Sequence, residues 1–99
     1  MTTRDQILSF IFQNRKMLLE KYHITRIGLF GSYARGEQKD SNDIDLLVEF
    51  EENTPDLYDL KLQLKDFFIQ EFGIETDICR EKYIKPRLKR AILKETVYA

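Results

Sequence analysis

Residues 42–50 restrict the fold more than any other stretch, because polar and apolar side chains alternate along them. Side chains on a β-strand point alternately to its two faces, so a period of two predicts a strand. One face is fully apolar and carries Ile44, Leu46, Val48 and Phe50. The other face carries Asp43, Asp45, Leu47 and Glu49. The stretch therefore predicts a strand with one apolar face and with two aspartates on the other.

Two long stretches have apolar residues at helical spacing. They predict helices at residues 3–21 and 57–72. Thr3 is the expected N-cap of the first helix, because its hydroxyl can accept a hydrogen bond from a free backbone N–H. Thr54 and Pro55 suit the N-cap and first turn of the second helix.

Shorter patterns lie between and after these helices. Apolar runs predict strands at residues 25–30 and 75–79. A short helix is expected just after the first of these strands, with Ser32 as its cap and Gly36 at its end. Residues 86–97 predict a closing helix.

The element order is therefore α-β-α-β-α-β-α, which predicts an α/β (α+β) fold with a small parallel or mixed sheet of three strands flanked by helices. On the closing helix, Leu88 and Ile92 are expected to face inward, and Val97 is a further candidate. With 99 residues, the chain is predicted to form a single domain over residues 1–99.

Charge and cysteine content narrow the classes of function. The formal net charge is −1, so the chain lacks the cationic excess that neutralises nucleic-acid phosphates, and we expect no direct nucleic-acid binding. The single cysteine, Cys79, allows no internal disulfide, and no export signal is recognisable at the N-terminus. No apolar stretch approaches the roughly 20 residues that span a bilayer. We expect a cytoplasmic protein without a membrane segment.

The two strand aspartates are candidates for metal binding. Asp43 and Asp45 share a face and lie roughly 6.5 to 7 Å apart along the chain. Like charges side by side repel, so the pair needs a cation, and Mg²⁺ prefers one or two carboxylates together with substrate phosphates. Asp77, on the predicted strand at residues 75–79, is the third candidate ligand and could accept the proton of an attacking hydroxyl. Two ions about 3.5 to 4 Å apart could share these ligands in phosphoryl transfer.

The Gly-Ser turn before these aspartates is a candidate phosphate site. Gly31 lets the backbone approach a ligand closely, and the free N–H groups at the start of the short helix attract anions. A triphosphate fits this site. Ser32 could add a hydroxyl hydrogen bond, and Arg35 could pair with a phosphate oxygen or with Glu37.

Each feature also has a purely structural explanation. A Gly-Ser pair after a strand is usually a capped turn, and two alternate aspartates on a strand are usually surface residues. The combination favours a site: an apolar strand, Gly-Ser, ten intervening residues, Asp-Ile-Asp in a second strand and a further strand aspartate.

This combination resembles the signature of the DNA polymerase β-like nucleotidyltransferase superfamily. The segment GSYARGEQKDSNDIDLLVEF is similar to the minimal nucleotidyltransferase (MNT) branch, the antitoxins of HEPN/MNT toxin–antitoxin pairs. The closing segment TDICREKYIKPRLKRAILKETVYA also resembles this branch, so the likeness covers nearly the whole chain. One departure is Asn42, where the family commonly has serine.

The resemblance implies a polymerase β-like nucleotidyltransferase fold, Mg²⁺ ions on Asp43, Asp45 and Asp77, and ATP held by Gly31 and Ser32. It also implies a type VII-like antitoxin that transfers AMP to a tyrosine of a cognate HEPN ribonuclease toxin and forms a hetero-oligomer with it. A second hypothesis is a non-catalytic antitoxin that masks the toxin by binding alone. Transfer to a small molecule is a third. The base preference and the number of nucleotides transferred stay open.

Overall fold

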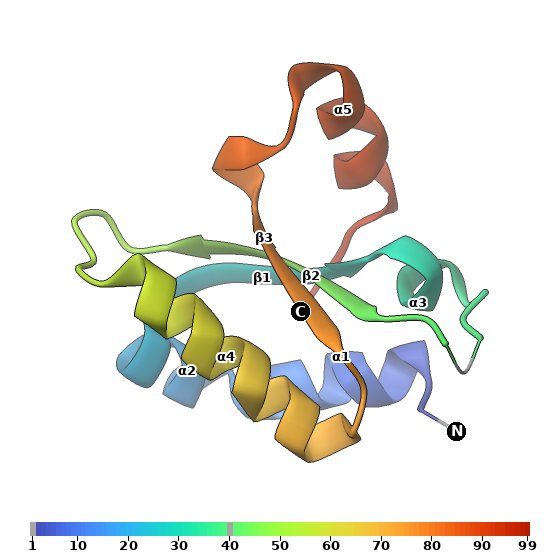
Figure 1. Cartoon of the computed structure of the whole chain (residues 1–99), viewed down its shortest axis with the longest axis horizontal. Coiled ribbons are helices and arrows are strands. Elements are labelled where there is room, and N and C mark those ends of the chain that lie inside the picture. Colours follow the sequence, from blue (N-terminus) through green and yellow to red (C-terminus); the bar gives the residue numbers. More distant parts are fainter. Residues whose placement is uncertain (1, 40) are drawn as a thin grey trace.

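The computed structural model describes residues 2–39 and 41–99. Figure 1 shows a thin sheet with helices on both of its sides. The elements, in chain order, are α1 (Arg4–Gln13), α2 (Arg15–Tyr22), β1 (Ile24–Phe30), α3 (Gly31–Arg35), β2 (Ile44–Phe50), α4 (Leu57–Phe72), β3 (Thr76–Arg80), the 3₁₀ helix η1 (Glu81–Tyr83), α5 (Pro86–Glu95) and β4 (Val97–Tyr98).

The strands form one mixed sheet in the order β3-β2-β1-β4. β1 is antiparallel to both β2 and β4, whereas β2 and β3 are parallel. The predicted mixed sheet flanked by helices is confirmed, but the predicted number of strands is wrong. Val97 and Tyr98, expected at the end of a helix, form β4 beside Leu29 and Gly28. Two residues are too few to leave a periodic signal in the sequence.

The two faces of the sheet differ in what covers them. α1, α2 and α4 cover one face, and α5 lies over the other (Figure 1). Ile44, Leu46, Val48 and Phe50 of β2 point to the first face and are at most 7% exposed. They pack with Ile7 and Ile11 of α1 and with Leu64 and Phe68 of α4, each of which is fully buried. The aspartates of β2 and β3 are therefore left to the side that carries α5.

The N-terminal helix departs from its prediction in one respect. Thr3 is its N-cap as expected, because the Thr3 hydroxyl accepts a hydrogen bond from Gln6 N at 3.2 Å and Gln6 Oε1 accepts one from Thr3 N at 2.9 Å. The single helix over residues 3–21 is wrong, since the helix breaks at Asn14. The Asn14 side chain donates to the Phe10 carbonyl at 2.8 Å, which competes with continued helix at this position.

The starts and ends of the later helices also differ. Thr54 and Pro55 do not begin α4, because the Thr54 hydroxyl donates to the Glu51 carbonyl at 2.6 Å in the preceding turn. Asp56 takes the N-cap position instead, with a left-handed φ of 57°. α5 begins at Pro86 as predicted. Leu88 and Ile92, which were expected to face inward, both line a pocket next to α5, but neither is buried and Leu88 is 46% exposed.

None of the described helices, in residues 2–39 and 41–99, combines the length and hydropathy needed to cross a membrane.

Candidate active site

The turn after β1 brings the backbone against a carboxylate. Phe30 is extended, Gly31 has a left-handed φ of 74°, and α3 starts at Gly31. A Cβ on Gly31 would overlap Asp45 Oδ2 and would lie 3.1 Å from Asp45 Cγ. Only glycine combines this backbone conformation with this close approach, so the turn and the carboxylate form one unit.

Ser32 is not the cap of α3, which corrects its prediction. Phe30 holds the N-cap position, without a side-chain hydrogen bond, and Ser32 lies inside the first turn. The end of the helix at Gly36 is as predicted, with a left-handed φ of 71°. Ser32 is still next to Gly31 and partly exposed, so it stays a candidate ligand of phosphate.

Two of the predicted aspartates are direct neighbours in the sheet. Asp45 pairs with Asp77 across the parallel strands β2 and β3, and on its other side Asp45 pairs with Phe30 of β1. Paired residues on adjacent strands point to the same face, so the two carboxylates lie side by side. The sequence patterns of two separate strands thus converge at one place.

Asp43 lies just outside β2, which begins at Ile44 rather than at residue 42. Just before β2, Asn42 Oδ1 accepts a hydrogen bond from Lys39 N at 2.7 Å. Among the described residues, no three His, Cys, Asp or Glu side chains are grouped as a ready-made metal site. The assignment of a metal to Asp43, Asp45 and Asp77 therefore stays a prediction, with Asp45 and Asp77 as its closest pair.

The environment of Asp45 favours a neutral or cation-bound carboxyl group. Burial is the largest cause that raises its pKa to about 6, followed by the negative charges of Asp77, Asp43 and Glu95. Arg35 opposes this shift. A cation beside Asp45 would offset the repulsion, so the electrostatics of the site suit a bound metal ion.

Arg35 pairs with two carboxylates, one of which was predicted. Its Nε lies 3.0 Å from Glu37 Oε2, and its Nη1 lies 2.8 Å from Glu95 Oε2. These hydrogen bonds, with Glu95 first, raise the pKa of Arg35. Glu95 Oε1 also accepts a hydrogen bond from Gly31 N at 3.4 Å, so the end of α5 is joined to the Gly31 turn.

A surface pocket opens beside the aspartates. This pocket, the carboxylate pocket, has a volume of about 460 Å³, and its lining includes Asp45, Asp77, Lys61 and Lys65. The two lysines are one turn apart on α4 and are partly buried. Within residues 2–39 and 41–99 neither forms an ion pair with a carboxylate, so their charges are available to an anion.

Sequence reasoning missed Lys61, Lys65 and Glu95. Two lysines four residues apart on a helix are equally typical of a solvated helix face, so their spacing carried little information. Glu95 is 64 residues from Gly31 in the chain, and no local pattern announces a contact at such a separation.

Comparison with known proteins decides the family. The model of the nucleotidyltransferase domain family matches residues 13–99. The chain belongs to this family. The family prediction is therefore confirmed, as is the prediction of a nucleotidyltransferase enzyme.

Relatives match this nucleotidyltransferase along almost its whole length. The protein adenylyltransferase MntA of Thermococcus cleftensis is 35% identical over 98 residues, which are 99% of this chain and 97% of the relative. A Methanocaldococcus jannaschii protein, provisionally named for the same activity, is 36% identical over 99 residues, 99% of each chain.

Solved structures agree on the fold. The structure of a provisionally named minimal nucleotidyltransferase has a TM-score of 0.79 and 29% identity, and the match covers 97% of this chain and 95% of the other. A Shewanella oneidensis complex of a tri-AMPylated HEPN toxin with an MNT antitoxin has a TM-score of 0.60 at 16% identity, covering 92% of this chain and 70% of the matched chain. The predicted nucleotidyltransferase fold is confirmed.

Proposed function

We propose that this nucleotidyltransferase is a Mg²⁺-dependent protein adenylyltransferase that transfers AMP from ATP to a tyrosine of a cognate HEPN toxin and so neutralises it. The observation that carries the proposal is the pairing of Asp45 with Asp77 beside the Gly31 turn, with two lysines in the lining of the same pocket. The names of the relatives support protein adenylylation. Toxin–antitoxin complexes among the structural neighbours, one of them with AMP-PNP, support the partner and the nucleotide.

Each group of residues has a role in this reaction. Asp43, Asp45 and Asp77 would hold Mg²⁺, which when bound offsets the negative charge of the reacting phosphate. Gly31 and Ser32 would contact the triphosphate through backbone N–H and hydroxyl groups, and Arg35 would pair with a phosphate oxygen. For this, Gly31 N and Arg35 exchange their contacts with Glu95 for contacts with the phosphates. Both substrates, ATP and a ribonuclease toxin, occur in the cytoplasm, so we place the reaction there.

The transfer itself is a displacement at phosphorus. The phenolic oxygen of the acceptor tyrosine attacks the α-phosphorus of ATP, and the bond from the α-phosphorus to the oxygen that bridges it to the β-phosphorus breaks. Pyrophosphate leaves with that bonding electron pair. Asp77 accepts the phenolic proton, because it is exposed on the edge strand β3 and accessible to an acceptor from another chain.

The test is to incubate the protein with ATP, Mg²⁺ and the product of the adjacent gene, and to weigh that product by mass spectrometry. We expect the mass of one or more AMP groups with the unaltered protein and none with Asp43→Asn or Asp45→Asn. Asp66→Asn is the matched control, because Asp66 is an exposed carboxylate on α4 outside both the carboxylate pocket and the Gly31 turn. No added AMP, or addition that survives Asp45→Asn, would reject the proposal.

The alternative is an antitoxin that masks its toxin without catalysis. The structural neighbours that form toxin–antitoxin complexes support a direct contact with the toxin, which this alternative also requires. The two functions separate in cells. If Asp43→Asn combined with Asp45→Asn still neutralises the toxin, binding alone suffices; if neutralisation is lost while the complex persists, catalysis is required.

A further inference from the structure

A second pocket lies between the sheet and the segment formed by η1 and α5. This pocket, the α5 pocket, has a volume of about 430 Å³. Its lining is mainly apolar and includes Phe30, Ile78, Cys79, Tyr83, Leu88 and Ile92. The lining also includes the cationic residues Lys61, Arg80 and Lys85, so the α5 pocket offers a mainly apolar, partly cationic surface next to the carboxylates.

The α5 pocket and the carboxylate pocket adjoin. Phe30, Lys61, Ile78 and Cys79 line both of them, so one ligand can extend from the first into the second. Such a ligand would meet Asp45, Asp77 and two lysines at one end and an apolar, partly aromatic surface at the other. A nucleotide has the same polarity, with a polyanionic phosphate chain at one end and a flat aromatic base at the other.

We propose that the α5 pocket holds the base of the nucleotide substrate, with Lys61 at the junction beside the phosphates. The proposal rests on the proposed function and deepens it. The pocket volume lies within the range of about 300–1,000 Å³ found for small-ligand sites. Lys61 is suited to the junction because, among the described residues, its ammonium group has no carboxylate partner.

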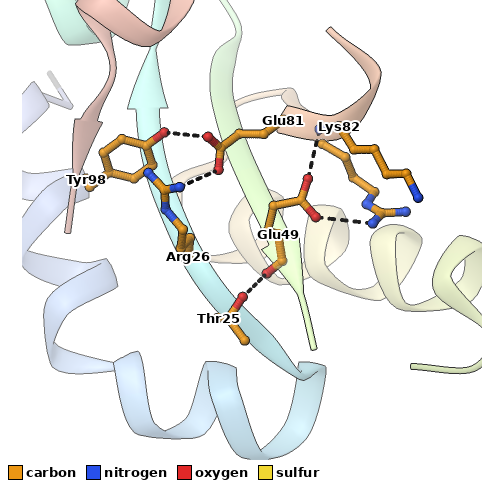
Figure 2. Close-up of polar contacts among 7 residues, drawn as sticks. Thr25, Arg26, Glu49, Glu81, Lys82 and Tyr98 are labelled. Atoms are coloured by element: carbon orange, nitrogen blue, oxygen red, sulfur yellow. Dashed lines mark hydrogen bonds and ion pairs between the residues drawn. The ribbon is translucent and has the colours of Figure 1, made fainter. Parts of the chain in front are cut away.

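The segment that covers the pocket is tied to the sheet at its start. Glu49 of β2 accepts a hydrogen bond from Lys82 N at 2.9 Å (Figure 2). Glu49 also accepts one from the Arg80 guanidinium at 3.1 Å. Glu81 of η1 pairs with Arg26 of β1 at 3.3 Å and accepts a hydrogen bond from the Tyr98 hydroxyl at 3.1 Å (Figure 2).

The same segment is tied at its other end by Glu95. The contacts of Glu95 with Arg35 and Gly31 hold the last turn of α5 beside the Gly31 turn. With both ends fixed, the pocket exists before a ligand arrives, and less binding energy is lost in ordering it.

An aromatic ring stands at the opening of the α5 pocket. Tyr83 is 69% exposed, and the Arg80 guanidinium lies 5.1 Å from the centre of its ring. An exposed ring next to an apolar pocket can stack on a base. When alanine replaces an aromatic side chain that stacks on a base, the affinity falls by about 5- to 150-fold.

The test compares two ligands on two variants of the full chain. Titration calorimetry with Mg²⁺ gives the Kd of AMP-PNP, which has a base, and of inorganic tripolyphosphate, which has none. Leu88→Trp fills the pocket from a half-exposed position, and Tyr83→Ala removes the ring. We expect each variant to weaken AMP-PNP at least fivefold and to leave the Kd of tripolyphosphate unchanged.

Matched controls exist for both changes. Leu19→Trp adds the same ring at a leucine that is 42% exposed on α2 and outside both pockets. Phe12→Ala removes an exposed ring that also contacts an arginine, with Arg15 4.8 Å from the ring centre. Neither control should alter either Kd.

The possible failures are distinguishable. If Leu88→Trp and Tyr83→Ala leave the Kd of AMP-PNP unchanged, the base site alone is overturned. The same holds if they weaken AMP-PNP and tripolyphosphate equally. If those variants instead raise only the KM for the protein acceptor, the pocket receives the acceptor and the inference is wrong. No uptake of AMP-PNP by the unaltered protein would overturn the proposed function together with the base site.

Discussion

Replacing Gly31 with alanine disturbs the site in two separable ways. The backbone has a φ of 74° there, and the left-handed conformation costs an L-residue about 1–2 kcal/mol. The new methyl group also overlaps Asp45 Oδ2, so the carboxylate must turn away from its position beside Asp77. The first effect lowers stability, and the second lowers both stability and activity.

Gly36→Ala separates the two effects. Gly36 has a φ of 71°, and a Cβ there would meet nothing within 4 Å. The free energy of unfolding of Gly36→Ala should therefore fall only by the backbone cost of about 1–2 kcal/mol. The free energy of unfolding of Gly31→Ala should fall by about 1 kcal/mol more. This is the low end of the cost of overpacking, because the half-exposed Asp45 side chain can rotate.

Thermal unfolding followed by circular dichroism measures the difference. For a chain of this size, about 1 kcal/mol corresponds to roughly 4–8 °C, so Gly31→Ala should melt that far below Gly36→Ala. In the Asp45→Ala background the excess cost of Gly31→Ala should fall, because only the Asp45 Cβ, at 3.3 Å, is then left to meet the new methyl group, and a double-mutant cycle reports this. Gly31→Ala should lose AMP transfer and Gly36→Ala should keep it. Equal melting temperatures, or full transfer by Gly31→Ala, would refute the reasoning.

Three further predictions concern charges at the site. Burial first, and neighbouring carboxylates second, raise the pKa of Asp45 to about 6, so the native state binds the proton more tightly than the unfolded state does. The metal-free protein should therefore gain stability relative to Asp45→Asn as the pH falls from 7 to 5, and urea unfolding with the same pH response in both proteins would contradict this. Lys61→Gln should weaken ATP binding about tenfold, as expected for a lost charged hydrogen bond, whereas the exposed Lys16→Gln should not; calorimetry checks both. Glu95→Gln removes a negative charge that raises the pKa of Asp45, so the NMR titration midpoint of Asp45 should move to lower pH, and an unmoved midpoint would exclude that influence.

The parts of the fold that the sequence predicts correctly depend on local patterns. The period of two along β2 predicts its buried face, and the helical spacing along α4 predicts Leu64 and Phe68 in the core. The Gly31 turn is predictable for the same reason, because a short apolar strand followed by glycine needs no distant partner to be recognised. The pairing of Asp45 with Asp77 follows once their two strands are taken to be neighbours.

The parts that the sequence does not predict depend on distant contacts or on competing hydrogen bonds. β4 exists because Val97 and Tyr98 pair with β1, and such a short strand has no period of its own. The break at Asn14 depends on a single side-chain hydrogen bond within an otherwise helical pattern. Lys61 joins the site through the packing of α4 against β3, which the sequence of α4 does not encode.

α5 is held to the molecule differently from the helices on the opposite face. None of its residues is buried, whereas α1 and α4 each place fully buried side chains in the core. Segments with few buried apolar contacts open at a lower free energy than the rest of a protein. The amide hydrogens of α5 should therefore exchange with solvent through local opening, well before those of α4. α5 can then open locally while the apolar core on the opposite face of the sheet stays folded, so a ligand can enter and leave the α5 pocket without global unfolding.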